Sequence, residues 1–490
     1  MEAPSRAPAV TPEAVDRAEL LALVVITVLG AICRLAALRQ PMRYDEAAAW
    51  ADFIGRSWWT ILSQYPTPNN HVFFSLLAKA TASLAPLQPW AIRLPALLPG
   101  IAIVPATWAV GRRLADRSTA LLGAALAAGS MPLVLYSANA RGHSIVVLGG
   151  LTLVLLGDRL RARPAWLVGW IAFVLVAALG LWTAPNMIYS IGAVSLWLAI
   201  GALTGEGRRH RDGRALLARV VGADVAALAL AWVLYLPIIR VAGLGAILAN
   251  KLVRPVPWPQ FARLLPPFLY ELAITWTAPL PPVAALLLFG LALAGIPRAR
   301  RDGPSFALAV IASCLALFLF SHAHPFVRVW LFFVPLFLLA VARGLVRLVA
   351  RWPLPVGVGA EWPSVALAAL VATVALTTRA AEGTDDTGRF AAAPEVTRVL
   401  APQLRPGDRV LAAIPLNGPL LWYFEGHGLD TAMLNTPPAA TRRAFLVLDP
   451  SRGQTFERAV QAGIVDPTRY GPPSQVARLP GAEVWRVERR

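Results

Sequence analysis

The sequence predicts an α-helical, multi-pass membrane protein with a small C-terminal α/β domain. Of its 490 residues, 57% are hydrophobic and only 15% are charged, and the mean hydropathy is +0.59. Soluble domains contain about 45–50% apolar and about 25% charged residues, so this composition excludes an ordinary soluble enzyme and a disordered protein. Long apolar runs extend as far as residue 378, and a more polar sequence follows.

Eleven apolar runs are long enough, or nearly so, to cross a bilayer, which takes roughly 20 residues. They are predicted at 20–38, 91–110, 118–136, 143–158, 165–182, 186–204, 217–239, 279–296, 305–321, 325–342 and 363–378. The aromatic, semi-polar stretch 39–90 is expected outside the membrane core. Within it, residues 71–85 are apolar on one face and include Lys79, which predicts an interfacial helix.

The distribution of arginine predicts the orientation in the membrane. Every second loop, beginning after the second run, holds three to five arginines, whereas the short turns on the other side hold only Arg141 and Arg328. Cytoplasmic loops of membrane proteins are enriched in Lys and Arg. We therefore expect residues 1–19 in the cytoplasm, loops 39–90 and 241–278 outside, and an uncleaved first span. The net charge of +18 then needs no nucleic-acid partner.

Residues 379–490 are predicted to form an extracytoplasmic soluble α/β domain that follows the membrane domain 20–378. Polar turns precede short strand-like and helix-like runs at 409–415, 418–425, 445–449, 456–463 and 483–487. A segment of about 100 residues can fold independently. The external loop 241–278 is rich in proline and tryptophan, a composition typical of the headgroup region.

Acidic side chains are scarce in the membrane domain, and the predicted orientation leaves only Asp45, Glu46, Asp52 and Glu271 outside. Asp45 and Glu46 open an amphipathic helical run just after the first span. Adjacent carboxylates point in different directions on a helix, so one can face a substrate while the other positions it or pairs with an arginine. Alternatively, both only favour the positive end of the helix dipole. Asp224, inside the seventh run, is a further candidate because charged groups within spans are generally functional.

Several short motifs follow this acidic pair in a fixed order. They are Asn69-Asn70-His71-Val72-Phe73-Phe74, Ala91-Ile92-Arg93-Leu94-Pro95, Tyr136-Ser137-Ala138-Asn139-Ala140-Arg141-Gly142-His143, and His324-Pro325-Phe326-Val327-Arg328. Over roughly residues 20–345, the sequence resembles the GT-C superfamily of integral-membrane glycosyltransferases. It resembles most the bacterial branch related to protein O-mannosyltransferases and the lipid A aminoarabinose transferase, although Val72-Phe73 replaces the Pro-Pro pair of that branch.

The resemblance implies a GT-C fold and transfer of a sugar, with inversion, from a polyprenyl-phosphate-linked donor. In this group the external acidic residue after the first span is the catalytic carboxylate. Asp45 is then the expected general base, a function worth typically 10²–10⁴-fold in rate, and Glu46 is expected to position it. Arg141 and Arg328 are expected to bind the donor phosphate, because guanidinium groups match phosphate oxygens. The alternative for both arginines is simple snorkelling to the interface.

Other polar residues on or near the outer face are expected to contact the substrates. They are Asn70, His71, Arg93, Tyr136, His143, Lys251, Glu271 and His324. His71 has the alternative role of beginning the interfacial helix. His322 and His324 lack the cysteine or Asp-x-Asp companions of a convincing metal site, so we expect no metal and no cofactor. No phosphate-binding Gly-x-x-x-x-Gly-Lys motif is present.

The predicted function is glycosyl transfer to an envelope lipid, glycan or protein at the outer face of a bacterial plasma membrane. The main alternative is a polytopic transporter or lipid flippase, for which similar halves and mid-membrane ionisable groups are typical. No half-to-half repeat is evident, and transport does not explain the long first loop or the C-terminal domain. A structural envelope protein would not need an external acidic pair, and transferases of phospho-alcohols usually carry a large soluble metal-binding domain.

Overall fold

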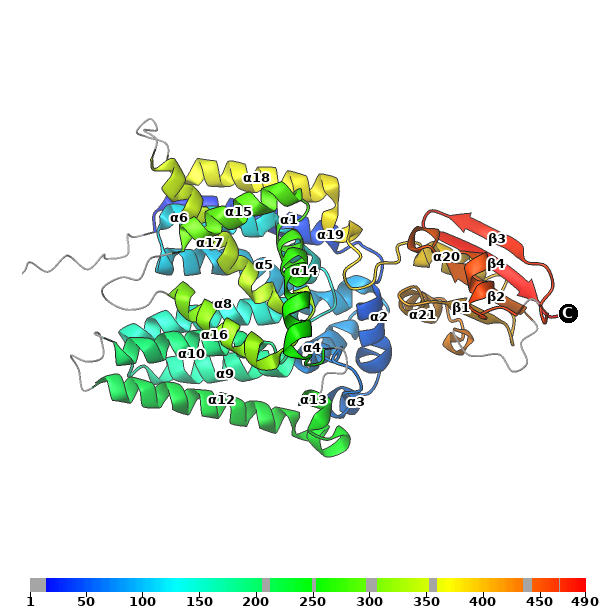
Figure 1. The fold of residues 1–490 in the computed structure, drawn as a ribbon, viewed down its shortest axis with the longest axis horizontal. Coiled ribbons are helices and arrows are strands. Elements are labelled where there is room, and N and C mark those ends of the chain that lie inside the picture. The colour runs from blue at the N-terminus through cyan, green and yellow to red at the C-terminus, as the bar shows by residue number, and fades with distance from the viewer. Residues whose placement is uncertain are drawn as a thin grey trace, which may run out of the picture.

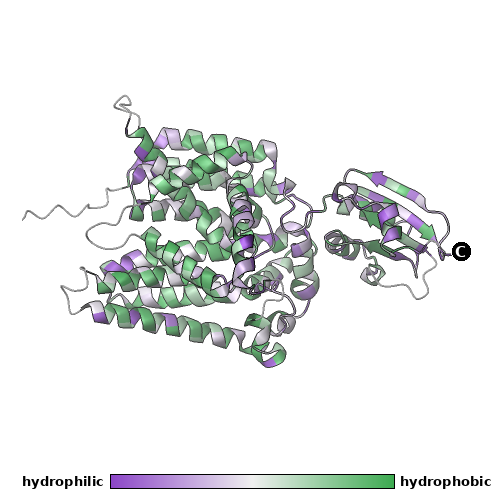
Figure 2. Cartoon of the chain, in the orientation of Figure 1, coloured by the Kyte–Doolittle hydropathy of each residue, from purple (hydrophilic) through white to green (hydrophobic). Residues whose placement is uncertain are grey.

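A bundle of long helices forms most of the molecule, and a small sheet domain lies beyond one end of it (Figure 1). The computed structural model describes residues 15–204, 212–248, 253–296, 306–351, 359–434, 443–466 and 468–490. Apolar residues cover the bundle helices along their length, whereas polar residues gather at the ends of the bundle and in the C-terminal domain (Figure 2). The predicted fold class, a multi-pass helical protein with a small sheet, is confirmed.

The eleven predicted runs each coincide with one helix or with two consecutive helices. These are α1 (Arg17–Ala37), α5 (Pro89–Leu114), α6 (Arg117–Gly129) with α7 (Met131–Ser137), α8 (His143–Ala162), α9 (Leu167–Thr183), α10 (Met187–Leu203), α12 (Asp212–Ala242), α15 (Pro282–Gly295), α16 (Phe306–Ser321), η2 (Val327–Phe333) with α17 (Val334–Val349), and α18 (Glu361–Thr378). In the described chain, five helices are long and apolar enough to span a membrane, or up to seven if each bent pair is one span. The total of eleven spans stays a prediction.

Two further groups of helices lie in the predicted external loops. Loop 39–90 forms α2 (Tyr44–Ala49), the π-helix η1 (Trp50–Ile54), α3 (Trp58–Ser63) and α4 (Val72–Ala82). Loop 241–278 is more regular than its proline content suggests, because it contains α13 (Gly245–Leu248) and the 20-residue α14 (Trp258–Thr277). Pro259 falls in the first turn of α14, where its missing N–H costs no hydrogen bond. A bend of 90° separates α14 from α15.

A buried arginine stabilises the break between α6 and α7, which bends the chain by 59°. Pro132 follows this break and has no N–H to donate to the carbonyl of Ala128. The Arg34 guanidinium donates to this carbonyl at 2.8 Å and to the carbonyl of Ala127 at 3.3 Å. In hydrocarbon, an unsatisfied carbonyl costs several kcal/mol. The bend therefore persists in the membrane, and it directs α7 towards the end of the bundle near α2.

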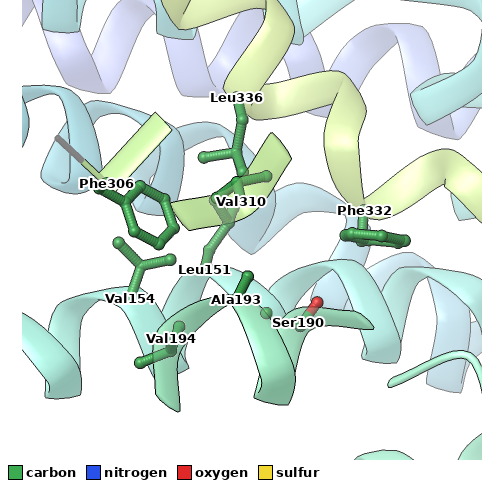
Figure 3. A pocket seen from close by; sticks show the side chains of 10 residues that line it. Leu151, Val154, Ser190, Ala193, Val194, Phe306, Val310, Phe332 and Leu336 are labelled. Carbon is green, nitrogen blue, oxygen red and sulfur yellow. The ribbon is translucent and has the colours of Figure 1, made fainter. Parts of the chain in front are cut away.

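A small cavity lies in the bundle core where α8, α10, α16, η2 and α17 meet. Its volume is about 10 Å³, close to the minimum for one water molecule. Figure 3 shows its lining, which is apolar apart from Ser190 and includes Leu151, Val154, Phe306 and Phe332. Such a lining offers no stabilisation to a charged substrate, so this cavity reflects imperfect packing of the helices.

The C-terminal domain contains a four-stranded sheet in the order β1-β2-β4-β3. Its elements are α20 (Ala393–Leu400), β1 (Arg409–Ala412), α21 (Asn417–Gly426), η3 (Thr431–Met433), β2 (Arg443–Leu448), η4 (Pro450–Arg452), α22 (Phe456–Gln461), β3 (Ser474–Leu479) and β4 (Ala482–Glu488). Strand β2 pairs parallel to β1 and antiparallel to β4. Because side chains alternate along a strand, Phe445 and Val447 pack with α20 and α21, whereas Leu446 packs with α22. This burial on both faces explains the unbroken apolar sequence of β2.

Helices α15 and α17 cross so closely that glycine is required on both. A Cβ atom on Gly344 would lie 1.9 Å from the carbonyl oxygen of Leu291, and one on Gly295 would lie 1.9 Å from that of Ala340. Small residues at such crossings allow the van der Waals contact that holds membrane helices together.

We predict that Gly344→Ala lowers the thermal stability of the purified protein, with a cost of about 1–3 kcal/mol for overpacking. Gly290→Ala is the matched control in α15, because an added Cβ there meets no atom within 4 Å. Thermal unfolding of both variants in the same detergent measures the difference. Equal melting temperatures for the two variants would contradict the close crossing.

Candidate active site

Glu46 and Arg93 form an ion pair with no exposed side-chain surface, which fixes the segment between α1 and α2. The Arg93 Nε and Nη2 atoms lie 2.8 and 2.7 Å from the two Glu46 carboxylate oxygens. Its remaining N–H groups donate to the carbonyls of residues 38, 40 and 41. Glu46 also accepts from the backbone N–H groups of Ala140 at 2.6 Å and Arg43 at 3.0 Å. All five guanidinium donors of Arg93 are thus satisfied within the protein, which leaves none for a substrate.

Asp45 lies between two arginines at the start of α2. Its Oδ2 atom is 3.6 Å from Arg141 Nη1 and 3.5 Å from Arg328 Nη2. The residue is only 8% exposed, and Oδ2 has no hydrogen-bond partner among the described residues. The two distances exceed those of charge-assisted hydrogen bonds, about 2.7–2.9 Å. Asp45 therefore has a carboxylate oxygen that is shielded, electrostatically stabilised and free to accept a proton.

Arg141 is held by the turn before α4. Its Nη1 donates to Asn69 Oδ1 at 2.8 Å, and its Nη2 lies 3.0 Å from His71 Nε2. The other ring nitrogen of His71, Nδ1, accepts from the N–H of Gly142 at 3.0 Å. Burial, followed by the nearby charge of Arg141, lowers the pKa of His71 well below its ordinary value. His71 is therefore uncharged at neutral pH and leaves the charge of Arg141 directed at Asp45.

Arg328 contacts a second carboxylate, which comes from the distant residue Asp386. Its Nη1 is 3.5 Å from Asp386 Oδ1, and the Tyr136 hydroxyl donates to Asp386 Oδ2 at 2.6 Å. The guanidinium carbon of Arg328 lies 4.2 Å from the centre of the Phe326 ring, which places the cation against an aromatic face. Both terminal nitrogens of Arg328 thus face a carboxylate, and neither is in a tight hydrogen bond with one.

Residues 381–388, which we term the linker segment, join α18 to the C-terminal domain and hold the start of α2. The segment includes the end of α19 (Ala380–Gly383). The Arg43 guanidinium donates to four carbonyls of the segment, those of residues 381, 382, 384 and 386, at 2.7–3.0 Å. The N–H groups of Tyr44 and Asp45 donate to the carbonyls of Gly388 and Thr387 at 2.9 and 3.2 Å. The first N–H groups of a helix have no partner within it, so the linker segment caps α2.

The C-terminal domain also contacts α2 directly through α21. The Tyr423 hydroxyl accepts from the N–H of Met42 at 3.1 Å, and Trp50 Nε1 donates to Glu425 at 2.9 Å. The rings of Trp50 and Trp422 meet edge to face, with their centres 4.9 Å apart. The C-terminal domain therefore buttresses the helix that carries Asp45.

The structure brings together six of the predicted site residues and separates the others. Asp45, Arg141, Arg328, His71, Tyr136 and His143 form one cluster, in which the His143 ring lies 4.7 Å from Tyr136 and 4.9 Å from His71. Glu46 and Arg93 lie beneath this cluster as scaffold, and Asn70 donates to the carbonyls of Ile61 and Gln64. His324 stacks on Phe261 beneath α14, Glu271 is exposed on α14, and Lys251 lies outside the described residues.

Sequence reasoning missed Asn69, Asp386 and Thr387. Asn69 stands at the start of the Asn69-Asn70-His71 motif, so its position was a usable signal. Asp386 and Thr387 belong to a polar turn more than 240 residues away from Tyr136 and Asn139, their partners. In the described part of the chain, no group of three His, Cys, Asp or Glu side chains has the arrangement of a metal site. The expected independence from metal stays a prediction.

Comparisons with known proteins identify the fold. No protein-family model and no curated protein sequence matches the chain. ArnT from Cupriavidus metallidurans, in a crystal structure bound to undecaprenyl phosphate, is similar with a TM-score of 0.58 and 14% identity, over 95% of this chain and 97% of that one. Its apo state gives the same values. The apo oligosaccharyltransferase of Archaeoglobus fulgidus has a TM-score of 0.50 and 13% identity, over 88% of this chain and 69% of that one.

These similarities show that the chain has the GT-C fold, so the resemblance noted in the sequence is confirmed at the level of the fold. The match with ArnT extends over nearly the whole length of both chains and therefore includes the C-terminal domain.

We predict that Glu46→Ala destabilises the protein by about 3–5 kcal/mol, because it leaves the Arg93 guanidinium buried without a counter-charge. Glu271→Ala is the control, since Glu271 is exposed on α14 and surface substitutions usually change stability by less than about 0.5 kcal/mol. Thermal unfolding of the purified variants measures both effects. A Glu46→Ala protein as stable as the control would show that the ion pair does not hold the site.

Proposed function

We propose that this protein is a membrane glycosyltransferase that moves a sugar from a polyprenyl-phosphate-linked donor to an envelope acceptor. The observation that carries the proposal is the shielded Asp45 carboxylate between Arg141 and Arg328, at one end of a bundle with the GT-C fold. The site combines one proton acceptor with two fixed cations, which is the set of groups that transfer from a phosphate-linked sugar requires.

Asp45 is the general base in this mechanism. It takes the proton of the acceptor hydroxyl while the hydroxyl oxygen forms a bond to the anomeric carbon of the sugar. The bond from that carbon to the phosphate oxygen breaks, and its electron pair stays on the phosphate. Attack from the face opposite the leaving phosphate inverts the anomeric configuration. The Oδ2 atom of Asp45 accepts no hydrogen bond from the described residues, and this supports the role.

Arg141 and Arg328 stabilise the negative charge that gathers on the leaving phosphate. Their terminal nitrogens approach Asp45 from two different segments, the turn before α8 and the start of η2. Fixed cations lower the barrier most where charge develops, because they are in place before the reaction begins. ArnT, which has a similar structure, is bound to undecaprenyl phosphate, and this supports a lipid phosphate as the leaving group here.

We further propose that the site faces the exterior of a bacterial plasma membrane. The arginines in the last turns of α5 and α8 lie at the end of the bundle away from Asp45, where Arg112 pairs with Glu19 and Arg113 with Asp158. The positive-inside rule assigns that end to the cytoplasm. A polyprenyl-linked donor reaches the opposite end from within the bilayer, and the acceptor approaches from the envelope.

A transporter or flippase is the alternative from a different functional class. Asp224, the acid within a predicted span that would support it, lies towards the inner end of that span and accepts a hydrogen bond from Ser195 on the neighbouring helix at 2.8 Å. Such a local pair is typical of helix association in membranes. The cluster around Asp45 favours the transferase, because its positive and negative side chains lie together at one end of the bundle and do not line a transport pathway through it.

We predict that Asp45→Asn abolishes sugar transfer, with a loss of about 10²–10⁴-fold in turnover, while the donor still binds. The assay supplies a panel of polyprenyl-phosphate sugars and bacterial membrane extract to the purified protein in lipid vesicles, and measures released polyprenyl phosphate. Asp52→Asn, an exposed acid in the adjacent η1, is the matched control and should retain activity. Full activity of Asp45→Asn would refute the base assignment. If wild type releases nothing with any donor, a lipid flux assay in the same vesicles tests the alternative.

We also predict that transfer continues after treatment with EDTA, since the two arginines supply the charge that a metal would provide. The measurement compares the initial rate of polyprenyl phosphate release before and after chelation, and after addition of Mg²⁺ or Mn²⁺. A rate that is lost with EDTA and restored by one of these metals would contradict the prediction.

A further inference from the structure

Asp386 is a charged member of the site that the proposed mechanism leaves without a role. Its carboxylate faces Arg328 with one oxygen and accepts a 2.6 Å hydrogen bond from Tyr136 with the other. Its backbone carbonyl accepts from Arg43 at 2.7 Å, so the linker segment is held in place independently of the carboxylate charge. The charge itself therefore calls for a separate explanation.

The described charges of the site have a small positive excess. Ion pairs join the guanidinium groups of Arg93, Arg141 and Arg328 to the carboxylates of Glu46, Asp45 and Asp386. The Arg43 guanidinium is a fourth cation beside them, and it donates to the backbone carbonyl of Asp386. Burial lowers the pKa of Arg43 only to about 10, so it remains charged at neutral pH. His71 is uncharged. The cluster thus carries one net positive charge before substrate binds.

The single positive charge of the site balances the charge of the donor but not that of the product. The donor is a phosphodiester with one negative charge, which brings the site to neutrality. During transfer, the acceptor proton moves to Asp45 and the electron pair of the broken bond moves to the phosphate, so the total charge does not change. Once Asp45 has released its proton to water, the phosphomonoester product carries about two charges and the site becomes negative by one. Shielded excess charge is unfavourable.

We propose that Asp386 weakens binding of the doubly charged polyprenyl phosphate product more than binding of the singly charged donor, and so promotes product release. Repulsion between Asp386 and a bound phosphate is proportional to the charge on the phosphate. The same carboxylate therefore acts twice as strongly, in free energy, on the product as on the donor. This inference rests on the proposed function, because it requires a lipid phosphate beside Arg328.

A purely structural role would give a different pattern. If Asp386 served only to hold Arg328 and Tyr136 in place, its neutralisation would weaken the binding of both lipids by a similar factor. A role in charge discrimination instead predicts tighter binding of both, with the larger gain for the monoester. Asn is the informative replacement, since its side-chain oxygen can still accept from Tyr136.

The test measures binding of two probes, polyprenyl phosphate and its monomethyl ester, to the full-length protein in nanodiscs at pH 8. The methyl ester is a phosphodiester with one charge, whereas the monoester is doubly charged because its second pKa is about 6. For Asp386→Asn we expect the dissociation constant to fall about tenfold for polyprenyl phosphate and about threefold for the methyl ester, in proportion to charge. Asp386→Ser is a second neutral variant. Agreement between the two variants shows that the effect comes from the lost charge and not from a folding defect of one replacement.

Asp385→Asn is the matched control, because Asp385 is exposed and pairs with Arg452 of the C-terminal domain at 2.6 Å. Its dissociation constants should equal those of wild type. Unchanged or weaker binding of polyprenyl phosphate by folded Asp386 variants, or an equal factor for both probes, overturns the inference and leaves the proposed function intact. Failure of wild type to bind either probe overturns the proposed function, and the inference with it.

Discussion

The carboxylate of Glu46 has no exposed surface, and the organisation of the site depends on the charge that it presents to Arg93. Removing one partner from a buried ion pair costs about 3–5 kcal/mol, so the two side chains are strongly constrained to remain together. Their shared hydrogen bonds join the segment after α1, helix α5 and the turn that leads to α8. Asp45 is the neighbour of Glu46 on the same helical turn. Because adjacent residues of a helix point in different directions, Asp45 cannot point inward with Glu46. Its carboxylate lies instead beside Arg141 and Arg328.

Local properties of the sequence were sufficient to predict the bundle and the centre of the site. The length of each apolar run predicted the helices, because hydrocarbon thickness and backbone hydrogen bonding leave few alternatives. The scarcity of acids on the predicted outer side left four candidates, and the resemblance to GT-C glycosyltransferases pointed to Asp45 among them. Arg141 and Arg328 stood out because they were the only arginines in the short outer turns. The structure places Asp45 within 3.6 Å of each of the two arginines, in two ion pairs. Their chemical roles stay predictions.

Features that depend on long-range packing could not be predicted in this way. Asp386 stands in a polar turn that resembles any linker, and only the folded chain brings it to Tyr136. Arg93 has the residue type of a phosphate ligand, yet its partners are carbonyls and Glu46, which no local pattern reveals. The helix α14 was obscured by its prolines, although one falls in the first turn, where proline is favoured.

The linker segment also has a consequence for the biogenesis of the protein. The N–H groups of Tyr44 and Asp45 donate to the carbonyls of Gly388 and Thr387, respectively, which are synthesised after the long apolar helix α18. At about 5–20 residues per second, the ribosome needs tens of seconds to travel that distance. A nascent chain therefore carries its acidic pair through most of membrane insertion without the cap that orders it. Two segments far apart in the chain must meet before the site exists, which ties assembly of the site to completion of the membrane domain.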